Sequence, residues 1–254
     1  MQKVTHSEYI AQKKPLAKQL LAKLNEKYQY ASVLITDNYE KGYRASRSGV
    51  AISATNAFGG KGMIVKVYDG KGYAEYSTNE ITAENLPEIE REIEQQLMNP
   101  ANFIPEGTEE AEYKCISDEP CTLCEATDYE IHPREVGDEK LIETVTALRE
   151  KAVKADERIL DAITGFNYQE YHKLFLSANR ELEQSVLYST GIMALVAAKG
   201  EEIKQSFRGF SNLGGAELLD KMESAIPQCV KTVTDLLNAE PMEPGTYECI
   251  CTPE

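Results

Sequence analysis

The fold class of this chain is decided by residues 62–78, GMIVKVYDGKGYAEYST. On both sides of the segment DGKG the residues are β-patterned, as in a half-buried strand. An Asp-Gly pair at positions 69 and 70 favours the positive φ of a tight turn. The stretch therefore predicts a β-hairpin with strands at 62–68 and 73–78.

The residues that precede this hairpin predict a helix followed by strands. Within 8–28, apolar residues recur every fourth position, which is typical of an amphipathic helix, and Thr5 and Glu8 have the spacing of a capping box. Short β-patterned runs follow at 31–36 and 43–55. A helix that leads into antiparallel strands makes this region α+β.

Two further helices are expected after the hairpin. Residues 86–97 have an apolar stripe and a proline in the first turn, which predicts a short helix. The apolar seam from Leu141 to Ile163 predicts a long helix over 138–164, capped by Asp138 and ended by Gly165.

The remaining pattern is four strands and a last helix. The strands are expected at 171–178, 183–190, 192–199 and 201–210. Because every residue from 192 to 198 is apolar, that strand is expected to be buried on both faces in the middle of its sheet. A helix over 214–238 contains Pro227, which should kink or split it.

This succession predicts two helix-plus-antiparallel-sheet units joined by a polar connector. We expect an N-terminal unit at 1–84, a short helix and connector or arm at 85–137, and a middle domain at 138–240. Residues 241–254 begin with prolines and a glycine and then alternate from Thr246 to Cys251. We expect them to be the first strand of a C-terminal β-domain whose remainder is missing from this sequence.

Composition narrows the class of protein. The chain has 254 residues, 42% of them hydrophobic and 27% charged, which is globular. A formal net charge of -15 argues against a nucleic-acid partner, because it provides no counterion release from phosphates. With neither a membrane-length apolar run nor the apolar core of a signal peptide, the sequence predicts a cytoplasmic protein without a membrane partner.

One cluster of metal-ligating residue types is present. Cys115, Cys121, Cys124 and His132 include a Cys-x-x-Cys pair and could hold zinc. The second half of a pair-plus-pair motif is absent, however, and the surrounding loop is polar, so reduced thiols in a surface loop are the favoured alternative.

No catalytic or cofactor-binding residue is identified by motif. His6, His132 and His172 are far apart in sequence and match no metalloprotease spacing. The glycine-rich stretch 59–62 precedes a strand, which disfavours a phosphate cradle. The stretch 208–215 precedes a helix and could bind an anion there, but a simple strand-to-helix turn is favoured.

The order of these segments resembles the TldD/PmbA family, once called modulators of DNA gyrase. Three places show the likeness: the hairpin GMIVKVYDGKGYA at 62–74, the region 149–198 with FLSANRE at 175–181 and ALVAA at 194–198, and PGTYE at 244–248. The resemblance implies a dimer, either a homodimer or a heterodimer of a metal-bearing and a metal-free subunit. It also implies a hydrolase that carries out proteolysis of unfolded peptides in an enclosed chamber.

For the full-length family metallopeptidase, the resemblance implies zinc held by a His-Glu-x-x-x-His helix and a later cysteine in the C-terminal domain. No position of this sequence matches those ligands, so no catalytic or metal residue is carried over. We therefore expect the scaffold and substrate-chamber portion of such a peptidase, inactive alone. The alternative is a non-catalytic, PmbA-like assembly or binding subunit that pairs with a metal-bearing partner. Either a fragment of a longer chain or a natural short form would be consistent with both.

Overall fold

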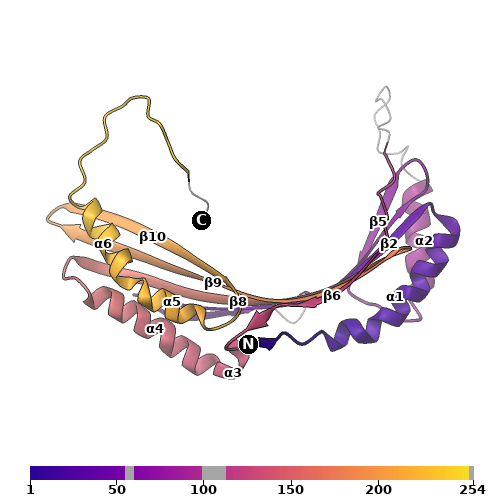
Figure 1. Cartoon of the computed structure of the whole chain (residues 1–254), viewed down its shortest axis with the longest axis horizontal. Helices are drawn as coiled ribbons and strands as arrows, with labels where there is room; N and C mark the ends of the chain where they lie inside the picture. Colours follow the sequence, from indigo (N-terminus) through magenta and orange to yellow (C-terminus); the bar gives the residue numbers. More distant parts are fainter. Residues whose placement is uncertain (55–59, 99–112, 252–254) are drawn as a thin grey trace.

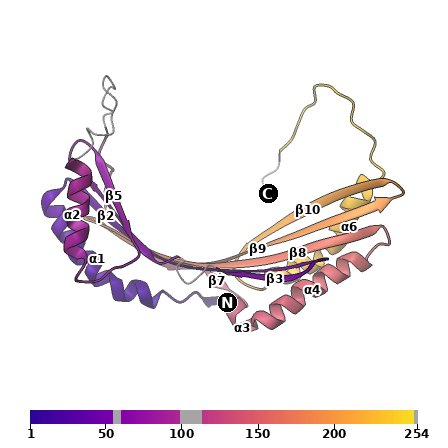
Figure 2. The same cartoon turned by 180° about the vertical axis from the view of Figure 1, so that it is seen from behind.

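The protein is a strongly curved β-sheet with its helices on the convex side. A computed structural model describes residues 1–54, 60–98 and 113–251. In Figure 1, the helices α1 (Glu8–Lys27) and α2 (Leu86–Met98) lie beneath one end of the sheet, and α3 (Pro133–Val136) to α6 (Ile226–Leu236) lie beneath the other. Figure 2 shows from behind that the concave side carries no helix of the described chain. The α+β fold class predicted from the sequence is confirmed.

Among the described residues, one sheet contains eight strands, and a separate two-stranded sheet includes the N-terminal residues Gln2 and Lys3. The path runs β10 (Glu202–Leu213), β9 (Arg180–Lys199), β8 (Ile159–Ser177), β2 (Tyr30–Ser46), β4 (Gly62–Tyr68) and β5 (Tyr73–Thr78). To this path β3 (Gly49–Ala54) is added against β2, and β6 (Cys121–Ala126) runs parallel to β9. The small sheet pairs β1 (Gln2–Lys3) with β7 (Asp128–Tyr129).

The helices agree with the expected positions except for two: a short helix at 133–136 lies in the stretch expected to be a connector, and the helix from Asp138 is shorter than predicted. They are α1 (Glu8–Lys27), α2 (Leu86–Met98), α3 (Pro133–Val136), α4 (Asp138–Lys154), α5 (Leu218–Ser224) and α6 (Ile226–Leu236). The predicted split at Pro227 is confirmed, because α5 and α6 are separate helices. The N-cap of α1 is Ser7, whose hydroxyl accepts the Ile10 amide at 3.1 Å, so the capping box at Thr5 was wrong.

The predicted hairpin between β4 and β5 is confirmed, and its turn has the expected chemistry. The Asp69 carboxylate accepts the backbone N–H groups of Lys71 and Gly72 at 2.8 and 2.9 Å. Gly70 has a φ of 104°, which a residue with a side chain rarely adopts. The same hydrogen bonds hold the pKa of Asp69 below its ordinary value.

Two hydrophobic clusters lie on the convex side, one at each end of the sheet. One packs α1 and α2 onto β2, β4 and the end of β8, with Leu20, Leu24 and Ile93 at its centre. The other packs α4, α5 and α6 onto β8 and β9, with Leu141, Phe166 and Met222 buried. Because β2 and β8 contribute to both clusters and pair from Ser32–Ser177 to Ala45–Thr164, the sheet is continuous.

The predicted helix over 138–164 was wrong in its second half. The helix α4 ends at Lys154, and Ile159 and Ile163 belong to β8. The Asp156 carboxylate accepts the Arg158 amide at 2.9 Å and forms a turn that ends the helix. The predicted end of this helix at Gly165 and its predicted cap at Asp138 were also wrong. Gly165 lies inside the strand, and Asp138 does not cap α4 but bonds Lys41 and Tyr43 on β2.

The strand expected at 192–199 is the second half of β9, and it is buried on one face only. Met193, Leu195 and Ala197 pack against the helices, whereas Ile192 is 41% exposed on the other face. The seven-residue apolar run predicted burial on both faces because the sequence does not reveal that the concave side is open.

The expected connector and terminal strand behave differently from the prediction. Part of the connector, 99–112, lies outside the described residues, whereas 121–126 form β6. Residues 246–251 form no strand among the described residues; Tyr247 and Ile250 are exposed, and the segment arches back above the concave side in both views (Figures 1 and 2).

Candidate functional site

The structure brings the three histidines of the chain together on the convex side of the sheet, between the two hydrophobic clusters. We call this region, which includes Glu170 and His172 of β8 and Ser185 of β9, the waist of the sheet. His172 comes from β8, His132 precedes α3, and His6 lies in the N-terminal segment before α1. This segment crosses beneath the waist between the two groups of helices (Figure 1). Three positions that are distant in sequence therefore become one polar site between the two hydrophobic clusters.

A buried serine joins two of these histidines. The Ser185 hydroxyl on β9 lies 2.9 Å from His172 Nδ1 and 2.9 Å from His6 Nδ1. Ser185 is 1% exposed and His172 is 7% exposed. A hydroxyl can donate one hydrogen bond and accept up to two, so Ser185 can donate to one ring nitrogen and accept an N–H from the other.

A buried carboxylate occupies the other end of the network. Glu170 lies two residues before His172 on the same face of β8, and its oxygens lie 3.6 Å from His132 Nε2 and 3.8 Å from His172 Nε2. Arg134 Nε is 2.7 Å away, close enough for an ion pair, although the angle does not give an aligned hydrogen bond. The Arg134 guanidinium also stacks on the Tyr39 ring at 4.2 Å.

These charges determine the ionisation of Glu170. Burial raises the pKa of its carboxyl, but the favourable interactions with the nearby His172, Arg134 and His132 outweigh burial and hold the pKa below its ordinary value. Glu170 is thus a buried carboxylate kept ionised by the groups that surround it.

The exposed end of the network is at His6. Its Nδ1 lies 3.7 Å from a Glu183 oxygen, and its Nε2 lies 3.5 Å from the Cys124 sulfur. Glu183 is also paired with Lys14 of α1 at 2.8 Å. The hydrogen bonds from His172 through Ser185 to His6 can pass a proton toward the surface, but Ser185 is too buried to meet a substrate.

The zinc alternative placed on Cys115, Cys121, Cys124 and His132 is not supported by their positions. Cys121 and Cys124 point to opposite faces of β6, and His132 faces Glu170. Within the described ranges, which include all four residues, no three His, Cys, Asp or Glu side chains lie close enough to hold a metal ion. The zinc implied by the family resemblance therefore has no fitting ligand set in the described chain.

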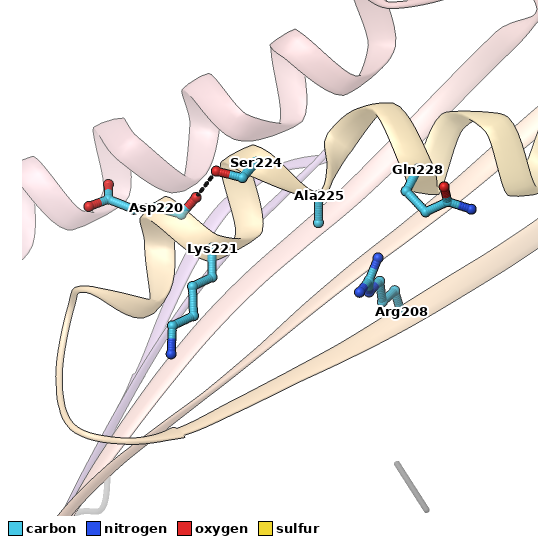
Figure 3. Close-up of a pocket in the computed structure, with 6 residues that line it drawn as sticks. All are labelled: Arg208, Asp220, Lys221, Ser224, Ala225 and Gln228. Carbon is cyan, nitrogen blue, oxygen red and sulfur yellow. Dashed lines mark hydrogen bonds between the residues drawn. The ribbon is translucent and has the colours of Figure 1, made fainter. Parts of the chain in front are cut away.

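The glycine-rich stretch before α5 is a turn, as favoured from the sequence. The Glu217 carboxylate accepts the Gly215 amide at 2.8 Å and so occupies the position an anion would take. A shallow cavity of about 500 Å³ beside this turn is lined by Arg208 of β10 and by residues of α5 and α6 (Figure 3). In Figure 3 the Arg208 and Lys221 side chains do not converge on a common point.

A second surface of interest is the concave face of the sheet. The outer strand β10 presents three exposed apolar side chains there, Ile203, Phe207 and Leu213. Register places Phe207 beside Ala194 and Ile163, and these residues line a hollow of about 290 Å³. A row of apolar residues also crosses the sheet near its other end: Leu123, Leu182, Phe175, Leu34 and Ile64.

Sequence reasoning missed Glu170 and Ser185, although one signal was available. In β8 every second residue from Phe166 to Leu176 faces the helices, and Glu170 and His172 are the two polar members of that series. Two ionisable residues at strand positions that face the core indicate a polar site. The partners of that pair, from β9 and the N-terminal segment, have no such signal.

No helix in the part of the chain that the structure describes is long and apolar enough to cross a membrane. No family model matches the sequence, and no curated protein matches it either. The fold, however, is similar to those of solved proteins.

A candidate modulator of DNA gyrase from Bacteroides thetaiotaomicron superposes with a TM-score of 0.66 at 17% identity, covering 92% of this chain and 52% of its own. A second such protein, from Thermotoga maritima, has a TM-score of 0.68 at 14% identity, covering 91% and 50%. TldE from Thermococcus kodakarensis has a TM-score of 0.60 at 13% identity, covering 86% and 47%.

The resemblance to the TldD/PmbA family is therefore confirmed at the level of the fold. This chain spans about half the length of the structures it matches.

Proposed function

We propose that this chain forms the scaffold and substrate-chamber wall of a TldD/PmbA-like peptidase that acts on unfolded peptides. The proposal rests on one observation: the fold, which is similar to those structures over 86–92% of the chain, has a curved sheet face that no helix of the described residues covers. A concave face with exposed apolar side chains provides contact area for an extended, unfolded segment.

The charge of the chain influences which peptides this wall admits. With 42 acidic and 27 basic residues, the surface repels acidic peptides and attracts basic ones. Because exposed charges are screened by salt, this preference weakens as ionic strength rises.

The binding role is tested with two isoleucines of similar exposure on opposite faces. Ile192 is 41% exposed on the concave face, and Ile52 is 49% exposed on the face of Tyr43, which packs against α4. We expect Ile192→Asp to weaken binding of a fluorescent, unfolded apolar peptide about tenfold, and Ile52→Asp to leave it unchanged. Equal effects of the two changes would reject the concave face as the binding surface.

The catalytic part of the proposal is tested by assay and metal analysis. We expect the 254-residue chain alone to hydrolyse no peptide and to bind no stoichiometric zinc, because the described residues contain no fitting ligand set. Robust peptide hydrolysis by this chain alone would contradict the scaffold role.

A second candidate is a non-catalytic assembly subunit that pairs with a metal-bearing partner. The observation that favours it is the outer strand β10, which within the described chain pairs with β9 alone and exposes Ile203, Phe207 and Leu213. Size-exclusion chromatography with a metal-bearing TldD-like protein, followed by a peptidase assay of any complex, distinguishes this candidate from the scaffold role. A stable complex that gains activity over the partner alone supports this candidate, and the absence of any complex contradicts it.

A further inference from the structure

The thiol of Cys124 contacts the imidazole of His6 at the surface of the waist. The Cys124 sulfur on β6 lies 3.5 Å from His6 Nε2, and Cys124 is exposed. Cys121, three residues earlier on the same strand, is also exposed but faces the opposite side of the sheet. A thiol within reach of a histidine that is itself oriented by another group is the arrangement of an activated cysteine.

The buried network orients this histidine. The Glu170 carboxylate favours a proton on His172 Nε2, which leaves His172 Nδ1 bare to accept the Ser185 hydroxyl. The Ser185 oxygen then accepts from His6 Nδ1–H. His6 Nε2 is left bare and faces the Cys124 thiol, so the tautomer of the surface base is assigned by a carboxylate three groups away.

The surrounding charges support proton transfer from the thiol to His6. Glu183 lies 3.7 Å from His6 Nδ1 and stabilises the imidazolium, while its other oxygen pairs with Lys14. The Lys3 ammonium bonds the Ala126 carbonyl at 3.4 Å and places a cation two residues along β6 from Cys124. Transfer therefore yields a thiolate with an imidazolium beside it, and the thiolate is the reactive form.

We propose that Cys124 is a base-assisted thiol that exchanges with low-molecular-weight disulfides. The Cys124 proton passes to His6 Nε2, and the sulfur attacks one sulfur of the disulfide. A new S–S bond forms as the S–S bond of the reagent breaks, and the leaving thiolate takes the proton from His6. Cys124 is oxidised to a mixed disulfide, and one half of the reagent is reduced to a thiol. This site is independent of the proposed function.

Cys121 provides the matched control. Two variants are compared, both with Cys115, Cys249 and Cys251 changed to Ser; one also carries C121S and the other C124S. Each is mixed with an excess of an aromatic disulfide whose thiolate product absorbs visible light. We expect Cys124 to react about tenfold faster than Cys121 at pH 6.5, and His6→Asn to abolish the difference by slowing Cys124 alone.

Cys229, which is 4% exposed and retained in both variants, reports unfolding, because its reaction would reveal an opened core. Equal rates for Cys124 and Cys121 would overturn the proposal. An unchanged Cys124 rate in His6→Asn would also overturn it.

A second measurement does not depend on the His6 variant folding. In the chain with all three histidines, the Cys124 rate should fall less steeply than the Cys121 rate as the pH is lowered from 8 to 6, because the proposed proton transfer gives Cys124 a base that Cys121 lacks. Ser185→Ala should steepen the Cys124 profile toward that of Cys121. Parallel profiles for the two thiols in the original chain would reject the assistance by His6.

Discussion

Glu170 shows how a single residue at the junction of the two clusters acquires its role from its neighbours. Its carboxylate is buried, yet it remains ionised because Arg134, His132 and His172 surround it. A buried charge is tolerated when it is paired, and it becomes costly when its partners are removed. In the network that we propose, the same carboxylate also sets the direction of the hydrogen bonds that run through Ser185 to the surface.

We predict that Glu170→Gln lowers the free energy of unfolding by about 1–3 kcal/mol at pH 7, less than for a fully buried pair because Arg134 is half-exposed. The pKa of Glu170 is depressed in the folded state. Its contribution is therefore present above its unfolded pKa of about 4.3 and is lost as the pH falls through the folded value. Urea titrations between pH 3 and 7 should show a shallower acid loss for the variant. Glu130→Gln, at an exposed position, is the control. An equal decrease in the free energy of unfolding at pH 7 for this control would contradict the role assigned to Glu170.

At the scale of elements, the junction between β10 and α5 shows why one glycine is required and another is not. A Cβ on Gly215 would lie 2.0 Å from the Ile131 carbonyl oxygen, which is backbone and cannot move aside. That carbonyl accepts the Ala216 amide at 2.8 Å, so the two segments are held in place. Gly209, six residues earlier on β10, has no atom within 4 Å of its Cβ position.

We predict that Gly215→Ala lowers the free energy of unfolding by about 2–4 kcal/mol, because the methyl group forces the two backbones apart. Gly209→Ala is the control and should change it by no more than about 0.5 kcal/mol. Chemical denaturation of both variants checks the pair. A Gly215→Ala variant as stable as the original would mean that the α5 turn can shift away from Ile131.

At the scale of the whole molecule, two hydrophobic clusters share the strands that connect them. The long strands β2 and β8 pass from one cluster to the other and pair along most of their length. Loss of packing at one end therefore loosens the hydrogen-bond ladder on which the other end depends. The helices of each end contact their own cluster, so the coupling passes through the sheet.

We predict that the two ends unfold together. Leu24→Ala, at a fully buried position of α1, should cost about 2–5 kcal/mol and should reduce hydrogen-exchange protection in both clusters. Leu148→Ala in α4 is the reciprocal variant and should likewise reduce hydrogen-exchange protection in both clusters. Loss of protection confined to α1, β2 and β4 after Leu24→Ala would instead mean that the clusters unfold independently.

The sequence by itself determined the features that depend on local spacing. The hairpin at 62–78, the helix α1 and the split at Pro227 were predicted because turn residues, four-residue periodicity and a missing amide act within a few positions. The α+β class and the likeness to the TldD/PmbA fold followed from the order of such segments.

Only the tertiary structure decided which distant residues meet. Ile159 and Ile163 continue a helical spacing, but pairing with β9 makes them strand. His6, His132 and His172 acquire a shared site because β8, β9 and the N-terminal segment cross at the waist. Strand pairing is governed by burial and backbone hydrogen bonds between segments far apart in the chain, and no local spacing encodes such pairing.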